Sequence, residues 1–156
     1  SLDMYEAMKE AYQQKKVRAI GISNFQGTNY DRFMEKCGMT PAVHQIESHV
    51  YHSQLKFKRK MEKDGVQMES WASFTEGRKD IFHEPLLMEI AKKYQRSVAQ
   101  IVLAYLIQNG IVVIPKTIHK ERMIENMDVF DIVLSQDDMY RIQTLDQGQS
   151  LFHWYD

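Results

Sequence analysis

Apolar residues recur along the chain in two ways, as helical stripes and as short continuous runs. Apolar residues three or four positions apart predict helices near 3–12, 29–37, 54–64, 86–94, 98–109, from about 119, and 136–145. Short apolar runs between them predict strands at 17–22, 42–47, 66–71 and 111–115. Parallel strands need crossover helices, and apolar strands of this kind are buried on both faces. The predicted fold class is therefore α/β with a parallel sheet.

Several helix starts carry capping signals, in which an Asp or Ser is followed three residues later by an acidic or amide side chain. Three such pairs occur: Asp3 with Glu6, Ser97 with Gln100, and Ser135 with Asp138. The segment 72–84, in contrast, has no period and carries Gly77 among polar residues. It is predicted to be a long loop beyond the third strand, a place where loops often cover ligands.

Four strand–helix units fit two architectures. They form either a small doubly wound sheet or half of a (β/α)₈ barrel, and periodicity does not separate the two. In both architectures, ligands bind at the carboxyl ends of the strands. The unusual polar and aromatic residues lie at those ends: Ser23, Asn24, Gln45, Trp71, Lys116 and Thr117.

Composition excludes several classes of function. The chain has 156 residues, which suits a single domain with one core. Its 20 Lys and Arg against 21 Asp and Glu leave a formal charge of −1, so we expect no nucleic-acid partner and no membrane surface. Cys37 is the single cysteine, so a reducing, cytoplasmic location is expected. His44, His49 and His52 lack partners at a recognised ligand spacing, and no metal site is predicted.

One stretch concentrates phosphate-binding chemistry. Residues 112–126 read VVIPKTIHKERMIEN, an apolar strand followed by a turn and a helix start. Lys116 supplies a point charge and Arg122 a bidentate fork, while a helix amino terminus adds free N–H groups. Arg122 and Asn126 share a helical face. Taken alone, the stretch also fits a solvated helix start, and no G-x-G-x-x-G fingerprint accompanies it.

Together, five stretches resemble the aldo-keto reductases: VRAIGISNF, AVHQIE, ESWASF, VVIPKTIHKERMIEN and LSQDDMYRIQTLD. The resemblance covers essentially the whole chain, in the right order. Members of that family are NADP-dependent (β/α)₈ barrels, so it implies that residues 1–156 are the last four β/α units, a single half-barrel domain. A complete barrel usually takes about 250 residues. Relative to the family, the first four units are therefore expected to be missing.

The resemblance also implies an NADP site. Ser23, Asn24 and Gln45 correspond to the residues that hydrogen-bond the nicotinamide carboxamide, and Trp71 to the one that stacks on the nicotinamide ring. The residues implied at the adenosine 2′-phosphate and the adenine are Lys116, Thr117, Arg122, Glu125 and Asn126. His44 departs from the family, in which an Asn usually stands beside the strand Gln.

No catalytic residue is assigned, because the family's catalytic Asp, Tyr, Lys and His belong to the half that the resemblance does not cover. The implied function is reduction of small carbonyl compounds, with the chain inactive by itself. Two alternatives stay open: a non-catalytic half-barrel that forms a homodimer, and one chain of a split reductase completed by a complementary half. The carboxyl-terminal tail offers Phe152, Trp154 and Tyr155 as pocket aromatics.

Overall fold

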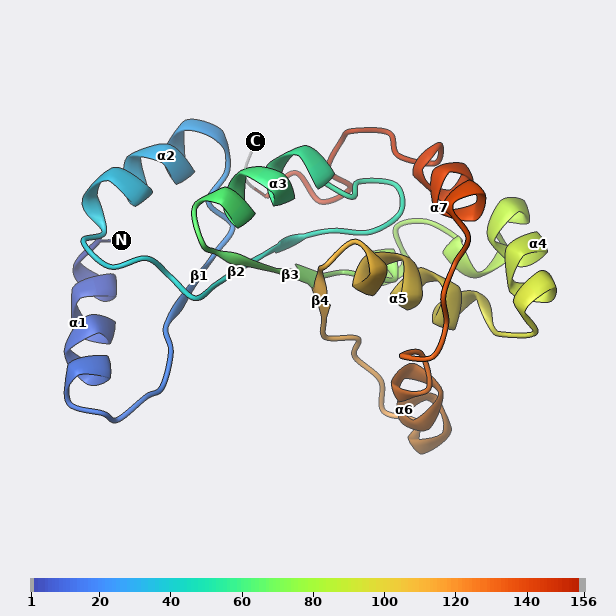
Figure 1. Cartoon of the computed structure of the whole chain (residues 1–156), viewed down its shortest axis with the longest axis horizontal. Helices are drawn as coiled ribbons and strands as arrows, with labels where there is room; N and C mark the ends of the chain where they lie inside the picture. Colours follow the sequence, from blue (N-terminus) through green and yellow to red (C-terminus); the bar gives the residue numbers. More distant parts are fainter. Residues whose placement is uncertain (1, 155–156) are drawn as a thin grey trace.

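The computed structural model describes residues 2–154, so Tyr155 lies outside the described part of the chain. At its centre is a parallel sheet with strand order β1-β2-β3-β4 (Figure 1). The strands are β1 Gly21–Ser23, β2 Val43–Glu47, β3 Gln67–Trp71 and β4 Val112–Val113. Strand order follows chain order without a reversal, so the sheet has no switch point of the doubly wound kind. The predicted α/β class with parallel strands is confirmed.

Helices flank the strands along the whole sheet. They are α1 Leu2–Gln13, α2 Gly27–Lys36, α3 Leu55–Lys63, α4 Pro85–Tyr94, α5 Val98–Gln108, α6 Lys120–Met127 and α7 Gln136–Gln143. In Figure 1, α1 and α2 lie at one end of the molecule and α4, α6 and α7 at the other, with the strands between them. The predicted loop 72–84 contains two short 3₁₀ turns, Thr75–Gly77 and Ile81–His83. No helix in residues 2–154 is long and apolar enough to cross a membrane.

The two outer strands are shorter than predicted. The apolar runs 17–22 and 111–115 continue beyond β1 and β4, each of which has a ladder partner on one side only within the described sheet. Gly21 allows β1 to approach β2 closely, because a Cβ at this position would lie 2.7 Å from the Val43 carbonyl oxygen. Run length overestimated these strands because pairing, not hydrophobicity, decides where an edge strand ends.

Two of the three predicted helix caps are confirmed. Ser97 Oγ accepts from Gln100 N at 3.2 Å and Ser97 N donates to Gln100 Oε1 at 3.1 Å, a complete capping box. Ser135 Oγ accepts from Asp138 N at 3.1 Å. The cap at Asp3 is wrong, because α1 already includes Leu2 and Asp3 lies inside its first turn.

The main core lies on the helix-facing side of the sheet. Ile46 of β2 and Met68 of β3 point to this side and pack with Met61 of α3 and with α5, which is buried from Gln100 to Leu106. A smaller cluster forms around Tyr5, Phe33 and Cys37. It joins the main core through partly buried residues shared by both clusters: Ile22, Phe25 and Met34.

The opposite face of the sheet is polar. Because side chains alternate along a strand, Gln45 and Glu47 of β2, together with Glu69 and Trp71 of β3, point away from the main core. In a closed barrel this face would line the interior. The structure therefore places the candidate functional residues on the inner face and at its carboxyl edge.

Candidate functional site

The carboxyl ends of the first three strands bring four predicted site residues together. Ser23 ends β1, and Asn24 follows it with a left-handed backbone (φ 60°), which Asn tolerates better than most residues. Ser23 Oγ and Asn24 N both donate to the Gln45 carbonyl oxygen, each at 3.0 Å. Trp71 ends β3, and its Nε1 donates to Asn24 Oδ1 at 2.8 Å. All four residues thus lie side by side at one edge of the sheet.

Neighbouring contacts decide which amide groups of this cluster remain available. Trp71 uses Asn24 Oδ1, so the Nδ2 donor of Asn24 remains. Gln45 Nε2 donates to Glu69 Oε1 at 2.6 Å, so the Oε1 acceptor of Gln45 remains. Within residues 2–154, no hydrogen bond joins either remaining atom to another group. A donor beside an acceptor is the arrangement that recognises a primary carboxamide, which carries one carbonyl oxygen and one NH₂.

The other predicted site residues line a hollow of about 510 Å³ beside α6. They are Lys116, Thr117, Arg122, Glu125 and Asn126. Among the described residues, neither Lys116 nor Arg122 takes part in an ion pair, so both cations are available to an anion. Two carboxylates, Glu76 and Glu125, also line the hollow. Anion binding here therefore depends on direct contact with Lys116 and Arg122 rather than on a net positive field.

A second hollow adjoins the one beside α6 and reaches Trp71. It measures about 620 Å³ and extends from Trp71 to Lys116. Phe74, Glu76 and Lys116 line both this hollow and the one beside α6. The two hollows form a groove from Trp71 to the cations Lys116 and Arg122, whereas Ser23 and Asn24 line a separate hollow of about 410 Å³ beside α2.

The three histidines considered as metal ligands do not share a site. His44 faces the helices, where its ring stacks on Tyr30 at 5.3 Å, and burial lowers its pKa to about 4. His44 Nε2 accepts from Phe25 N at 3.1 Å, so this neutral ring supports the turn that carries Asn24. Within residues 2–154, no group of three or more His, Cys, Asp or Glu is arranged to hold a metal ion.

A sequence model of the "Aldo/keto reductase family" matches residues 1–84 and 83–147. The chain belongs to the aldo/keto reductase family. Glyoxal reductase of Bacillus subtilis (strain 168) is 36% identical over 147 residues, which are 94% of this chain and 52% of that protein. This aldo/keto reductase sequence therefore spans about half the length of the curated relatives it matches.

Solved aldo/keto reductase structures show the same arrangement. MGS-M4, from a Medee basin deep-sea metagenome library, superposes with a TM-score of 0.93 at 35% identity, covering 97% of this chain and 56% of that one. A mutant of Gox0644 in complex with NADPH superposes with a TM-score of 0.88 at 34% identity, covering 96% of this chain and 55% of that one. The predicted half-barrel is confirmed, since the four parallel strands correspond to about half of a complete aldo/keto reductase barrel.

Sequence reasoning missed two residues that lie beside the candidate site. Glu69 orients Gln45, and Glu47 is buried at the end of β2 beside Trp71. A signal existed for Glu69, because it lies two positions before Trp71 in a predicted strand and so shares its face. Pairing of Glu69 with Gln45 depends on strand register, which the sequence does not show.

Proposed function

We propose that the chain forms the coenzyme-binding half of an NADPH-dependent reductase of small carbonyl compounds. The observation that carries this proposal is the groove that runs from Trp71, which is hydrogen-bonded to Asn24, to Lys116 and Arg122. A mutant of the related Gox0644 was crystallised with NADPH, and a relative of this chain is a glyoxal reductase. Bound NADPH would supply the hydride that reduces the carbonyl group.

Each end of the groove fits one end of NADPH. Asn24 Nδ2 and Gln45 Oε1 suit the nicotinamide carboxamide, with Ser23 beside them and Trp71 as the stacking surface. The other end suits the adenosine 2′-phosphate and the adenine through residues named above: Lys116, Thr117, Arg122, Glu125 and Asn126. A 2′-phosphate is the feature that distinguishes NADPH from NADH, so the unpaired cations favour NADPH.

The proton donor is proposed to come from a complementary half. Carbonyl reduction needs an acid whose pKa lies near the working pH. Burial raises the pKa of Tyr5 and of Tyr105 to about 12, and burial together with Glu84 raises that of Tyr51 to about 12. Burial also raises the pKa of Tyr30. These four phenols are weaker acids than a free tyrosine, which makes them poor candidates for the proton donor.

The open edges of the sheet support this second half. Within the described sheet, β1 and β4 each have an unpaired edge, and the free N–H and C=O groups of such edges can pair with further strands. A half supplying four more strands would close a barrel and cover the polar inner face. This half would come either from a longer chain that includes this segment or from a separate chain. The proposed location of the protein is the cytoplasm, where conditions are reducing.

A homodimer is the second candidate, because the same edges allow two copies to pair about a two-fold axis. It would bind coenzyme without turnover. The apolar surface that supports it lies on and beside α6 and is described below.

NADPH binding tests the proposal. Titration of the purified chain should quench the fluorescence of Trp71 with NADPH much more strongly than with NADH, because only NADPH carries the 2′-phosphate. Lys116→Glu should abolish the preference, and Lys56→Glu on the exposed face of α3 should leave it intact. Turnover with a small aldehyde should appear only when a complementary half is added. Equal binding of both coenzymes would contradict the proposed site.

A further inference from the structure

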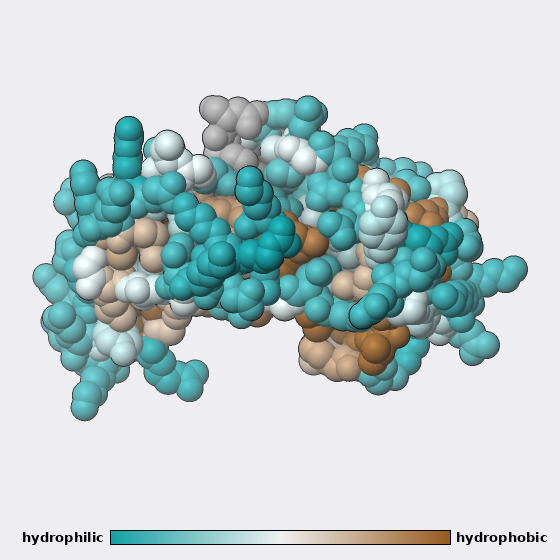
Figure 2. Space-filling model, turned by 45° about the horizontal axis from the view of Figure 1, so that its top comes forward, coloured by the Kyte–Doolittle hydropathy of each residue, from teal (hydrophilic) through white to brown (hydrophobic). Residues whose placement is uncertain are grey.

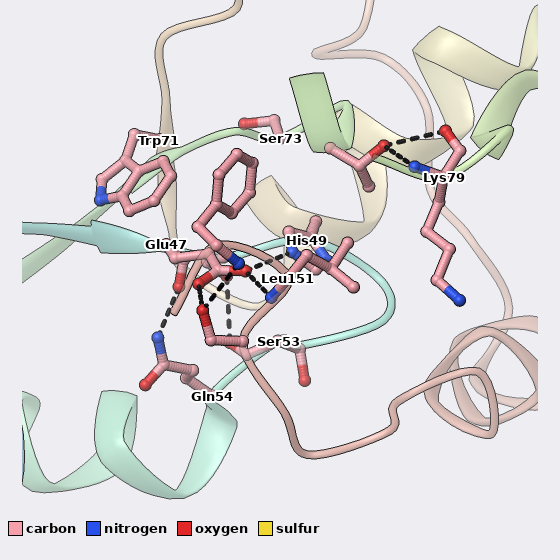
Figure 3. A network of polar contacts seen from close by, with 12 residues as sticks. Glu47, His49, Ser53, Gln54, Trp71, Ser73, Lys79 and Leu151 are labelled. Atoms are coloured by element: carbon pink, nitrogen blue, oxygen red, sulfur yellow. Dashed lines mark hydrogen bonds and ion pairs between the residues drawn. The ribbon is translucent and has the colours of Figure 1, made fainter. Parts of the chain in front are cut away.

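Glu47 is a buried carboxylate with several partners. It ends β2 opposite Trp71 in the β2–β3 register, and it is 0% exposed. Its Oε1 accepts from Leu151 N at 2.9 Å and lies 2.9 Å from His49 Nε2, while its backbone oxygen accepts from Gln54 Nε2 (Figure 3). A carboxylate buried this fully is costly unless its oxygens are hydrogen-bonded, so these contacts hold the side chain in one position.

The partners of Glu47 include the carboxyl-terminal tail, more than a hundred positions away in sequence. Ser150 Oγ donates to Glu47 Oε2 at 2.5 Å. The same hydroxyl oxygen accepts from Phe152 N and His153 N, each at 3.0 Å, and so fixes the turn at the start of the final residues. Glu47 therefore anchors this turn to the end of β2.

The anchored tail packs its rings against Trp71. Phe152 meets the Trp71 ring edge-to-face with centroids 4.9 Å apart, and the ring of Trp154 stacks on Trp71 at 5.0 Å and 15°. The Arg78 guanidinium lies 5.2 Å from the Phe152 ring. Trp71 is thus held by the two tail rings and by its hydrogen bond to Asn24.

We infer that Glu47 is a positioning residue for Trp71, acting through Ser150, Leu151 and the two tail rings. The inference rests on the proposed function only in taking Trp71 as the surface on which the nicotinamide stacks. Trp71 lines the hollow that leads to Lys116, and the tail rings do not, so the tail holds the indole without filling the groove. Tail order and coenzyme binding are therefore linked, and each stabilises the other.

Replacing Glu47 by Gln tests the anchor at nearly constant volume. The new NH₂ group cannot accept a hydrogen bond. In one orientation the NH₂ group faces Ser150 Oγ, which already accepts from Phe152 N and His153 N. In the other orientation it faces the backbone N–H of Leu151. Either orientation places donors against donors, so the tail should detach. Ser150→Ala removes only the connecting hydroxyl and should have the same effect.

Circular dichroism of the purified chain reports the result directly. The chain contains 2 tryptophans, Trp71 and Trp154, and stacked indoles give a pair of bands of opposite sign. The variants Glu47→Gln and Ser150→Ala should lose this pair of bands while keeping the helical signal. They should also bind NADPH about tenfold more weakly, because a preorganised stacking surface is lost. Trp154→Phe assigns the signal, and Glu62→Gln, an exposed carboxylate on α3, should retain it.

Persistence of the band pair in both folded variants would overturn the inference. If Glu47→Gln does not fold, Ser150→Ala decides, since it leaves the buried carboxylate in place. Loss of the pair with unchanged NADPH affinity would overturn the link between the tail and the coenzyme site. Failure of the unaltered chain to bind NADPH would instead overturn the proposed function, and it is distinguishable because the dichroism is measured without coenzyme.

Discussion

At the scale of single residues, this site depends on how two amides are oriented. An amide side chain offers a donor and an acceptor, and its neighbours decide which one faces a ligand. Trp71 takes the oxygen of Asn24, and Glu69 takes the nitrogen of Gln45. In the proposed coenzyme site, Glu69 would therefore act through Gln45 and not by direct contact with the coenzyme.

Glu69→Leu should reduce the ability of the site to recognise a carboxamide. Without Glu69, the Gln45 amide is free to turn its NH₂ outward, where it repels the NH₂ of the nicotinamide carboxamide. The preference for NADPH over its 3-acetylpyridine analogue, which has a methyl group in place of that NH₂, should fall about tenfold. Binding titrations with NADPH and with the analogue measure this preference, and Glu62→Leu at an exposed position of α3 is the control. An unchanged preference would show that Gln45 keeps its orientation without Glu69.

At the scale of elements, His44 joins β2 to two helices. Its ring stacks on Tyr30 of α2 and meets Phe57 of α3 edge-on at 5.8 Å. Nδ1 lies 3.2 Å from Met61 Sδ, and Nε2 accepts from Phe25 N, an arrangement that suits a neutral ring. Protonation would place a charge between packed helices, which is why burial lowers the pKa of His44 to about 4.

This packing predicts that stability falls on acidification. Between about pH 6.5 and pH 4, the unfolded chain binds a proton at His44 that the folded chain does not, so the free energy of unfolding decreases as pH falls through this window. The full loss from His44 is roughly 3 kcal/mol. Urea unfolding measured at several pH values in this range should show this decrease in the free energy of unfolding.

His44→Gln provides the comparison for that experiment. The variant should lose this part of the pH dependence, even if it is less stable throughout. The slope that disappears belongs to His44, because the other titrating groups are common to both proteins. Identical slopes for the chain and the variant would contradict the assignment.

At the scale of the whole molecule, apolar surface remains exposed near both edges of the sheet. On and beside α6, Ile124 is 63%, Met127 is 68% and Phe130 is 71% exposed, and Figure 2 shows apolar colour at this end of the molecule. At the other end, Met8 and Tyr12 of α1 are also exposed, whereas Tyr5 is the buried residue of that helix. Exposed apolar surface is typical of interaction sites when it forms a large patch.

Met127→Glu should weaken association of the chain. A charge at this position would have to be desolvated in any interface formed by α6. Sedimentation at micromolar concentration should show assemblies for the unaltered chain and a shift toward monomer for the variant. Met88→Glu on α4, where Met88 is also exposed, is the matched control and should leave the mass unchanged. A stable, folded monomer of the unaltered chain would contradict the prediction.

The sequence by itself determined the features that depend on local pattern. Hydrophobic periodicity predicted the α/β class, and local side-chain chemistry predicted the capping box at Ser97 and the loop 72–84. The motifs at the strand ends predicted candidate site residues, which the structure places in two groups, one around Trp71 and Asn24 and one beside α6.

Only the tertiary structure decided what depends on contacts between distant segments. Strand register pairs Gln45 with Glu69, and chain folding brings Ser150 to Glu47. The outer strands β1 and β4 each have a ladder partner on one side only within the described sheet, and they are shorter than their apolar runs. Met8 and Tyr12 of α1 stay exposed. Periodicity shows that a helix has an apolar face, but the elements packed around it determine whether that face is buried.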